Sequence, residues 1–512
     1  MGTASNTSRI AKNTLLLYFR QILIMLVSLY TVRVVLNVLG AEDYGIYNVV
    51  AGVVTMFGFL SGAMATASQR YFAFDLGKED YEHLKTTFSV TFQIYVLLAV
   101  IIVVLAETIG LWFVMNKLVI PPERMTAAIW IYQAAVFSFV MKFVAMPYMA
   151  SVIAHENMNV YAYVGIAEVI LNLAIVFALQ IGVYDRLIMY GCLLAIVSLV
   201  CTLIYRLYCK HNYNECKFQF VKDKALFKEL VSYSGWNLFG SLSGIFKRQG
   251  VNIILNLYFG ALVNAAYSIA LQVSHATSTF AQNFVTAMRP PIIKNYAAEQ
   301  YDETKRMVFS GCKFVFYLVF IFALPLALEM DIVLNIWLKK EVSETMVTMT
   351  RLSVVEVLIL SMSFLIMALA QATGKIKKYQ SVVGGILLLN LPISWVVLEC
   401  GFPAYSVVIV AVLVEAIAML ARVSIVGKLT FFTVKEFLVK VAVPCAIVII
   451  TSSLIPIYYH CYEDENIFRL CMVTVISVLT TLISVLTIGV TKTEREFIFN
   501  KAKNFVSKIK KK

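Results

Sequence analysis

The stretch GAEDYGIY, residues 40–47, is matched 220 residues later by GALVNAAY, residues 260–267. Both stretches open with a Gly-Ala pair and end with a tyrosine, and both lie between long apolar segments. One such match is compatible with chance. It gains weight only if other parts of the chain repeat at nearly the same distance.

A second match lies at almost this offset. Tyr161 and the run Leu171-Asn172-Leu173 recur 218 residues later as Tyr379 and Leu389-Asn390-Leu391. The shared offset indicates an internal duplication, and it spans six long apolar segments. Because six is an even number, the second copy enters the membrane from the same side as the first, so the copies are parallel. Two such bundles facing each other across a gap suit transport by alternating access.

The composition places the chain in a membrane. Hydrophobic residues make up 60%, charged residues 14%, and the mean hydropathy is +0.81, whereas charged residues are about 25% of soluble domains. The sequence therefore predicts an all-α membrane protein with fourteen transmembrane helices, in two parallel six-helix bundles plus two extra C-terminal helices. The fourteen apolar windows are 13–38, 44–67, 88–115, 126–148, 158–180, 187–205, 230–258, 262–288, 307–329, 352–372, 379–399, 403–421, 436–458 and 470–490.

The duplication also predicts the domain boundaries. We expect an N-terminal six-helix bundle at 1–209, an inter-lobe linker at 210–229 and a C-terminal six-helix bundle at 230–430. The last part, 431–512, holds helices 13 and 14 and a basic tail. Apolar residues and lysines recur in this tail at helical spacing, which suits an amphipathic helix on an anionic membrane surface. A solvated tail that serves only topology explains it equally well.

The distribution of basic residues predicts the orientation. Most of the 43 Lys and Arg residues lie in the termini and in alternate loops on one side of the membrane, and basic loops stay in the cytoplasm. Both termini are therefore expected to be cytoplasmic. Topology accounts for most of the net charge of +13, so no nucleic-acid partner is needed.

Basic residues inside the apolar windows are the clearest sign of a site, because a lipid-facing cation is costly at membrane depth. There are seven of them: Arg20, Arg33, Lys142, Lys247, Arg248, Lys313 and Lys440. Lys247 and Arg248 lie midway along the first helix of the second copy, while Arg20 and Arg33 lie in the first helix of the first copy. We expect these four to line a central cleft that binds an anion.

Other interpretations stay open for each cation. Arg33 and Arg20 are near enough to helix ends to extend toward lipid headgroups. The three lysines that are not assigned to the cleft lie near cytoplasmic helix ends, where extension toward the headgroups is the better explanation. They are Lys142, Lys313 and Lys440. Lys247 and Arg248 are adjacent and so point about 100° apart on a helix. We therefore expect one of them to face the cleft and the other to pair internally.

Four uncharged or acidic candidates complete the predicted site. Glu168 and Glu415 lie at membrane depth, where a carboxylate either couples transport to H⁺ or Na⁺ or pairs with a buried cation. His275 and Gln272 belong to a run, 272–283, that is unusually polar for a spanning helix. Such a run is expected to face a wet interior that suits a sugar, although a histidine of this kind also serves in packing.

Motifs for catalysis and for metal binding do not occur in the sequence. It contains neither a G-x-x-x-x-G-K-[ST] phosphate loop nor an H-E-x-x-H zinc motif. The nine cysteines are odd in number and lack the spacing of metal ligands. We therefore expect a protein that is not an enzyme and needs no metal or cofactor.

Several segments resemble a known family. RVVLNVLGAEDYGIY at residues 33–47, followed by a helix and Gln69-Arg70-Tyr71, is similar to the start of polysaccharide flippases of the multidrug, oligosaccharidyl-lipid and polysaccharide (MOP) exporter superfamily. AHENM at 154–158 and AQATG at 370–374 look like the paired cytoplasmic turns of that family. The likeness covers essentially the whole chain, and its motifs identify the family better than the substrate.

The resemblance implies a multi-pass protein of the bacterial inner membrane that flips a polyprenyl-diphosphate-linked oligosaccharide to the outer leaflet for surface polysaccharide, such as lipopolysaccharide. Its partners would be this lipid-linked oligosaccharide, membrane lipids and polysaccharide polymerase machinery. The diphosphate would sit against Arg20, Arg33 and Lys247 or Arg248, since charge-assisted hydrogen bonds to phosphate are strong in a partly desolvated site.

Two alternatives are weighed against this function. A cation-coupled multidrug exporter of the same superfamily would want carboxylates in the first helix, and none occurs between Asn13 and Val38. A membrane-embedded polysaccharide polymerase would need a large outer loop with catalytic basic residues, whereas the outer loops predicted here are short.

Overall fold

The computed structural model describes residues 3–118, 120–181, 185–339, 342–492 and 494–496. Within these ranges the chain forms helices and turns and no strand, as expected for an all-α membrane protein. The predicted amphipathic tail lies outside the described residues, except for its first few positions.

The helices follow one another closely along the chain. They are α1 (Thr3–Thr55), α2 (Gly58–Gly77), α3 (Tyr81–Leu105), α4 (Leu111–Asn116), α5 (Met125–Ala154), α6 (Met158–Ile181), α7 (Arg186–Asn212), α8 (Lys224–Ala297), α9 (Tyr301–Leu328), α10 (Met330–Leu338), α11 (Glu344–Ser361), α12 (Phe364–Ala372), α13 (Ile376–Leu388), α14 (Asn390–Glu399), α15 (Ser406–Leu429), α16 (Val434–Phe437), α17 (Val443–Tyr462) and α18 (Ile467–Ser484). Short π or 3₁₀ turns occur at Ala106–Gly110, Pro122–Arg124, Asn214–Cys216, Leu438–Ala442 and Val485–Gly489.

Twelve helices among the described residues are long and apolar enough to span a membrane, or thirteen if a bent pair counts as one more. The chain is therefore a multi-pass membrane protein, but the predicted count of fourteen is not confirmed. The bent pair consists of Glu42–Thr55 and Gly58–Gly77, which meet at 46°. The difference from fourteen lies in α8, because the predicted windows 230–258 and 262–288 both fall inside this one helix.

Gly260 interrupts α8, and Gly40 interrupts α1 in the same way. Gly40 has φ 82° and ψ 167°, and Gly260 has φ 73° and ψ −166°, inside otherwise helical segments. This backbone conformation is essentially restricted to glycine, since a Cβ atom would clash with its own backbone. Each glycine ends one helical stretch and lets the chain begin the next in a new direction. The matched Gly-Ala pairs in the sequence thus mark two equivalent breaks.

Other backbone features repeat at the same offset. Among the described residues, eight have positive φ, and six of them form three pairs separated by 220 or 218 positions: Gly40 with Gly260, Glu79 with Glu299, and Glu156 with Gly374. The turns at Glu79 and Glu299 also share their hydrogen bonds, with each glutamate N–H donating to the carbonyl three residues earlier. This register supports an internal duplication at the level of the backbone.

The described chain divides into two compact units. The first comprises Met1–Leu242 and Thr286–Gln300, and the second comprises Ser243–Val285 and Tyr301–Lys512. The boundary falls inside α8 rather than in the predicted linker, because α8 begins at Lys224 and continues without a loop into the second unit. The end of α8 returns to the first unit.

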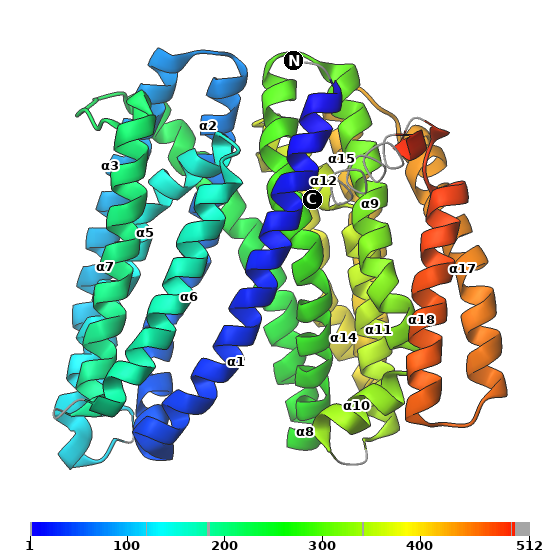
Figure 1. The fold of residues 1–512 in the computed structure, drawn as a ribbon, viewed down its shortest axis with the longest axis horizontal. Coiled ribbons are helices and arrows are strands. Elements are labelled where there is room, and N and C mark those ends of the chain that lie inside the picture. Colours follow the sequence, from blue (N-terminus) through cyan, green and yellow to red (C-terminus); the bar gives the residue numbers. More distant parts are fainter. Residues whose placement is uncertain (1–2, 119, 182–184, 340–341, 493, 497–512) are drawn as a thin grey trace, which may run out of the picture. The chain divides into compact units, whose positions relative to one another are not determined.

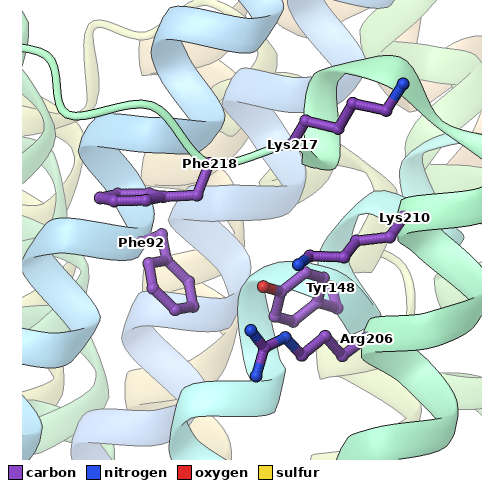
Figure 2. A pocket seen from close by; sticks show the side chains of 6 residues that line it. All are labelled: Phe92, Tyr148, Arg206, Lys210, Lys217 and Phe218. Carbon is purple, nitrogen blue, oxygen red and sulfur yellow. The ribbon is translucent and has the colours of Figure 1, made fainter.

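In the first unit, α5 packs on α7, α2 and α3, while α1 packs on α6, and α3, α5, α6 and α7 run side by side (Figure 1). Tyr132, Ile131 and Val50 belong to a buried cluster in this unit. A cavity of about 490 Å³ is lined by residues of α3, α5, α7 and the segment after Asn214–Cys216 (Figure 2).

One polar network ties together three helix ends of the first unit. Arg124, just before α5, forms ion pairs of 2.5 Å with both Asp43 of α1 and Asp185. Asp185 also caps α7, because its Oδ1 accepts from the backbone N–H groups of Leu187 and Ile188 at 3.0 and 3.2 Å. Burial raises the pKa of Asp185, but the hydrogen bonds from Arg124 and the backbone outweigh it, and the pKa lies below its ordinary value.

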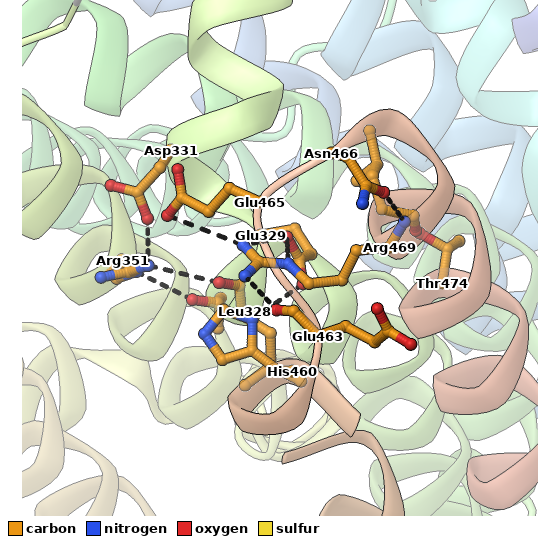
Figure 3. A network of polar contacts seen from close by, with 12 residues as sticks. Leu328, Glu329, Asp331, Arg351, His460, Glu463, Glu465, Asn466, Arg469 and Thr474 are labelled. Carbon is orange, nitrogen blue, oxygen red and sulfur yellow. Dashed lines mark hydrogen bonds and ion pairs between the residues drawn. The ribbon is translucent and has the colours of Figure 1, made fainter. Parts of the chain in front are cut away.

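In the second unit, α15 packs on α11 and α13, and α9 packs on α11. The α17–α18 hairpin, the predicted helices 13 and 14, packs on α9. A buried network joins its turn to the end of α9 (Figure 3). The fully buried carboxylate of Glu329 contacts His460 Nδ1 at 2.8 Å and Arg469 Nη2 at 3.1 Å. The hairpin is therefore held by charged contacts as well as by apolar packing.

Candidate functional site

Arg20 is the predicted cation with the most constrained surroundings in the first unit. Its guanidinium lies over the ring of Tyr161 in α6, with Cζ 4.4 Å from the ring centroid. A Cβ atom at Gly165 would lie 2.4 Å from Arg20 Nε, so this glycine leaves the space that the guanidinium fills. Arg20 Nε is buried and has no hydrogen-bond partner within the described residues. Because Arg20 as a whole is only half-buried, its terminal guanidinium nitrogens, rather than the covered Nε, are the donors that remain for a ligand.

Arg33 does not share this setting. It is exposed on α1, thirteen positions from Arg20, which corresponds to about 20 Å along a helix. One diphosphate is too short to contact both side chains. The predicted joint contact of Arg20 and Arg33 with a single diphosphate is therefore not supported by the geometry of α1.

Glu168, a candidate for ion coupling, has a cationic partner. Its Oε1 lies 2.6 Å from Lys142 Nζ, and the two side chains are 31% and 53% exposed. Lys142 was expected to extend toward headgroups, and instead it links α5 to α6 through this pair. The pair agrees with one of the two roles weighed for Glu168, and ion coupling at this residue stays a prediction.

Lys247 lies in a buried charged network of the second unit. Its Nζ is 2.7 Å from Glu356 Oε1 and 3.1 Å from Glu415 Oε2. Glu415 Oε1 in turn lies 2.5 Å from Arg422 Nη1, and Arg422 also donates to Ser363 Oγ at 3.3 Å. This network of two cations and two carboxylates joins α8, α11 and α15.

The burial of this network changes what its members offer a ligand. Lys247 is 5% exposed, and Glu415 and Arg422 are each 3% exposed. Because both carboxylates compensate the ammonium group, Lys247 presents no free positive charge in this conformation. Lys247 and Glu415 are thus paired with each other in this conformation, while contact of Lys247 with a diphosphate and ion coupling at Glu415 stay predictions. The adjacent Arg248 is exposed, which fits the expectation that only one of the two pairs internally.

The polar run on α8 lies on its surface. Gln272 and His275 are both exposed, and Thr279 follows four positions after His275, so the three share one helix face. The hydroxyl of Thr279 donates to the backbone carbonyl of His275 at 2.8 Å. The face combines an amide and an imidazole that are suited to hydroxyl groups of a ligand.

The predicted cations do not occupy equivalent positions of the two copies. With an offset of 220, Arg20 corresponds to Gly240 and Lys247 corresponds to Val27. The duplication therefore repeats the backbone but not the charges. The cations of the two first helices therefore lie at different levels along their helices.

The predicted site omits two arginines, Arg70 and Arg289, because each lies just beyond the end of a predicted apolar window. Arg70 is buried, with its guanidinium 4.4 Å from the ring centroid of Tyr71 and 4.5 Å from that of Phe74. Arg289 donates to Gln69 Oε1 at 3.4 Å. These two residues are separated by 220 positions, so they occupy equivalent positions of the duplication. The Gln69-Arg70-Tyr71 motif was visible in the sequence, but a count of cations inside apolar windows passes over it.

A second missed cluster surrounds Glu156, in the turn between α5 and α6. This buried residue contacts Arg9 at 2.7 Å and Lys294 at 3.0 Å, and its backbone carbonyl accepts from Asn13 at 3.2 Å. The cluster connects α1, this turn and the last part of α8 within the first unit. Only the AHENM motif pointed to this turn in the sequence.

Comparison with known proteins agrees with this architecture. A family model described as polysaccharide biosynthesis protein matches residues 10–296, more than half of the chain. No curated protein sequence matches the chain.

Solved structures of transporters share the fold. An outward-facing multidrug resistance transporter of the MATE family, from the MOP superfamily, has a TM-score of 0.70 at 13% identity, with 83% of this chain and 96% of that chain covered. A MOP superfamily transporter from Pyrococcus furiosus has a TM-score of 0.65 at 13% identity, with 84% and 96% covered. The MATE transporter VcmN from Vibrio cholerae, in its bent form, has a TM-score of 0.64 at 16% identity, with 85% and 100% covered. At these identities the likeness establishes the fold alone.

Proposed function

Because the chain belongs to the family of polysaccharide biosynthesis proteins, within the MOP superfamily of transporters, we propose that it flips a polyprenyl-diphosphate-linked oligosaccharide across a bacterial inner membrane. Transport runs from the cytoplasmic to the outer leaflet by alternating access, with both termini in the cytoplasm. The product supplies polymerase machinery for surface polysaccharide. In this proposal the protein moves its substrate without chemical change and is not an enzyme.

The setting of Arg20 is the observation that carries this proposal. A cation inside a membrane span is retained against a large cost of desolvation, and Arg20 has no carboxylate to compensate it in the described part of the chain. Its guanidinium lies over the ring of Tyr161, and the absence of a side chain at Gly165 leaves room for it. A diphosphate compensates this charge through the terminal guanidinium nitrogens, since guanidinium binds phosphate oxygens through paired hydrogen bonds.

The second unit contributes by a different chemistry. The charge of Lys247 is compensated by Glu356 and Glu415, so we assign this residue a structural role in holding α8, α11 and α15 together. Gln272 and His275 on the exposed face of α8 offer donors and acceptors to sugar hydroxyls. Arg248, which is exposed, is the remaining cation of this unit for a phosphate.

The multidrug alternative is less well supported. A cationic drug needs a carboxylate that is not already neutralised, yet Glu415 lies between two cations and Glu168 pairs with Lys142. The stretch of α1 from Asn13 to Val38 contains no acidic residue. The fold shared with MATE transporters is the observation that keeps this alternative in view.

The proposal is tested by deleting the gene and measuring lipid-linked oligosaccharide on each leaflet. The deletion strain is expected to accumulate it on the inner leaflet and to lose surface polysaccharide, and the wild-type gene restores both. Arg20→Gln is expected to restore about 10- to 100-fold less transport, since a hydrogen bond to a charged group contributes about 1.5–3 kcal/mol. Arg20→Lys is expected to keep part of the activity, because it keeps the charge without the planar fork.

Arg33→Gln is the matched control, since it removes one cation from the same helix at an exposed position. Membrane levels of each variant are measured by immunoblot. Unchanged surface polysaccharide in the deletion strain, together with new drug sensitivity, would contradict the proposal in favour of the multidrug alternative. Equal losses from Arg20→Gln and Arg33→Gln would contradict the specific role of Arg20.

A further inference from the structure

The cavity of the first unit is lined by residues that the proposed transport site does not use. It measures about 490 Å³, within the range of small-molecule sites, and its lining consists of Phe92, Tyr148, Arg206, Lys210, Lys217 and Phe218. Three of these six residues are basic and none is acidic. An anion is therefore the ligand that this lining favours.

Two of the cations point into the cavity. Arg206 and Lys210 are four positions apart on α7, which places them on the same helix face. Figure 2 shows both head groups directed toward the hydroxyl of Tyr148, a buried residue of α5. Neither cation forms an ion pair with a carboxylate of the described chain. The third, Lys217, points away, and its Nζ donates to Asn214 Oδ1 at 3.0 Å.

Aromatic rings form the opposite wall. The ring centroid of Phe92 lies 5.3 Å from that of Phe218 and 5.8 Å from that of Tyr148. Phe218 is itself exposed, and Phe220, two positions further on, is 71% exposed. A ligand whose charged group contacts α7 thus meets an apolar surface immediately beside it.

The same change from charge to apolar surface occurs along α7. Leu203, Leu207 and Lys210 are spaced four and three positions apart, so they lie on one face, and both leucines are exposed, Leu207 by 66%. The candidate membrane span that contains them ends at Asn212. Arg206 and Lys210 therefore lie near the level where a bilayer changes from acyl chains to headgroups, with Leu203 on the acyl side of both and Leu207 between them.

We propose that this cavity binds the phosphate headgroup of an anionic glycerophospholipid of the surrounding bilayer. Arg206, Lys210 and the Tyr148 hydroxyl contact the phosphate, while the acyl chains lie against Leu203, Leu207 and Phe220. Basic residues at the end of a span on the cytoplasmic side are the usual partners of anionic lipids, and the charge distribution of the loops assigns this end of α7 to that side. The inference does not depend on which substrate the protein transports.

Binding is measured on the purified full chain in a neutral detergent. The apparent melting temperature is followed during titration with phosphatidylglycerol, with phosphatidylcholine, with inorganic phosphate and with a polyprenyl phosphate. Saturable stabilisation is expected from phosphatidylglycerol only. Stabilisation by inorganic phosphate to the same extent would show a simple anion site, and stronger binding of polyprenyl phosphate would assign the cavity to the transported lipid. Either result would overturn the proposal.

The variants identify the site. Arg206→Ala with Lys210→Ala is expected to weaken phosphatidylglycerol binding about 30-fold, because each basic residue near an anionic surface contributes a factor of about five. The matched control is Lys377→Ala with Lys378→Ala, which removes two exposed lysines of α13 that do not line the cavity. Equal affinities of the two double variants would overturn the assignment, and so would unchanged affinity of the first. A Tyr148→Phe variant, which keeps the ring, is expected to lose a smaller factor.

Discussion

Replacing Glu415 by glutamine removes the central carboxylate of the buried network in the second unit. Lys247 keeps Glu356 at 2.7 Å, but Arg422 keeps hydroxyl partners alone among the described residues, Ser363 at 3.3 Å and Tyr379. Breaking a buried ion pair from one side costs about 3–5 kcal/mol, because the remaining charge stays buried without compensation. Since Lys247 retains one partner, we expect a loss at the lower end, about 3 kcal/mol of unfolding free energy.

The assay is equilibrium unfolding in mixed micelles, in which the fraction of denaturing detergent is raised and helicity is followed by circular dichroism. Glu168→Gln is the control, because its pair with Lys142 is less buried than the pairs of Glu415 and belongs to no larger network within the described chain, so a smaller loss is expected. A loss below about 1 kcal/mol for Glu415→Gln would refute the structural role of the network. Normal stability with abolished transport would instead identify Glu415 as an ion-coupling residue.

Three further outcomes are expected from other parts of the fold. Gly260→Ala should cost about 1–3 kcal/mol because of its positive φ, whereas Gly45→Ala, in a helical and open position of α1, should be neutral or stabilising in the same unfolding assay. Glu329→Gln should leave the buried Arg469 with the exposed Glu465, 3.7 Å away, in place of its buried carboxylate, and limited proteolysis should then cleave the turn between α17 and α18 sooner than in the wild type; equal cleavage rates would contradict the anchoring role of Glu329. Asp185→Asn should lower the melting temperature at neutral pH, and the difference from wild type should shrink as the pH falls below the ordinary carboxyl pKa of about 3.8, because a lowered native pKa stabilises only the ionised form. A difference that stays constant with pH would rule out this charge effect.

The arrangement of helices followed closely from the sequence. Apolar windows located the spans, although not their exact number, and the Gly-Ala pairs, noted in the sequence as a repeat, lie at the two helix breaks, because glycine is favoured where φ is positive. The count differs because Gly260 bends the backbone without a loop, so two predicted windows fall in one helix. Sequence patterns report the polarity of a segment, and they carry less information about how a helix ends.

The site was harder to predict. The partners of Lys247 lie 109 and 168 positions away in the chain, on helices α11 and α15, and spacing alone does not indicate such contacts. The polarity of residues 272–283 was visible, and the structure places Gln272 and His275 on an exposed face. Arg70 was passed over because it lies just outside an apolar window, although aromatic rings on its own helix bury it.

The central claim is that Arg20 binds the diphosphate of the transported lipid, and it is tested most directly with purified protein in vesicles. The rate at which a fluorescent lipid-linked oligosaccharide crosses the bilayer is measured for the wild type, Arg20→Lys and Arg20→Gln at equal protein content. We predict a rate about 10- to 100-fold lower for Arg20→Gln, and an intermediate rate for Arg20→Lys. Wild-type rates for a correctly inserted Arg20→Gln protein would contradict the claim.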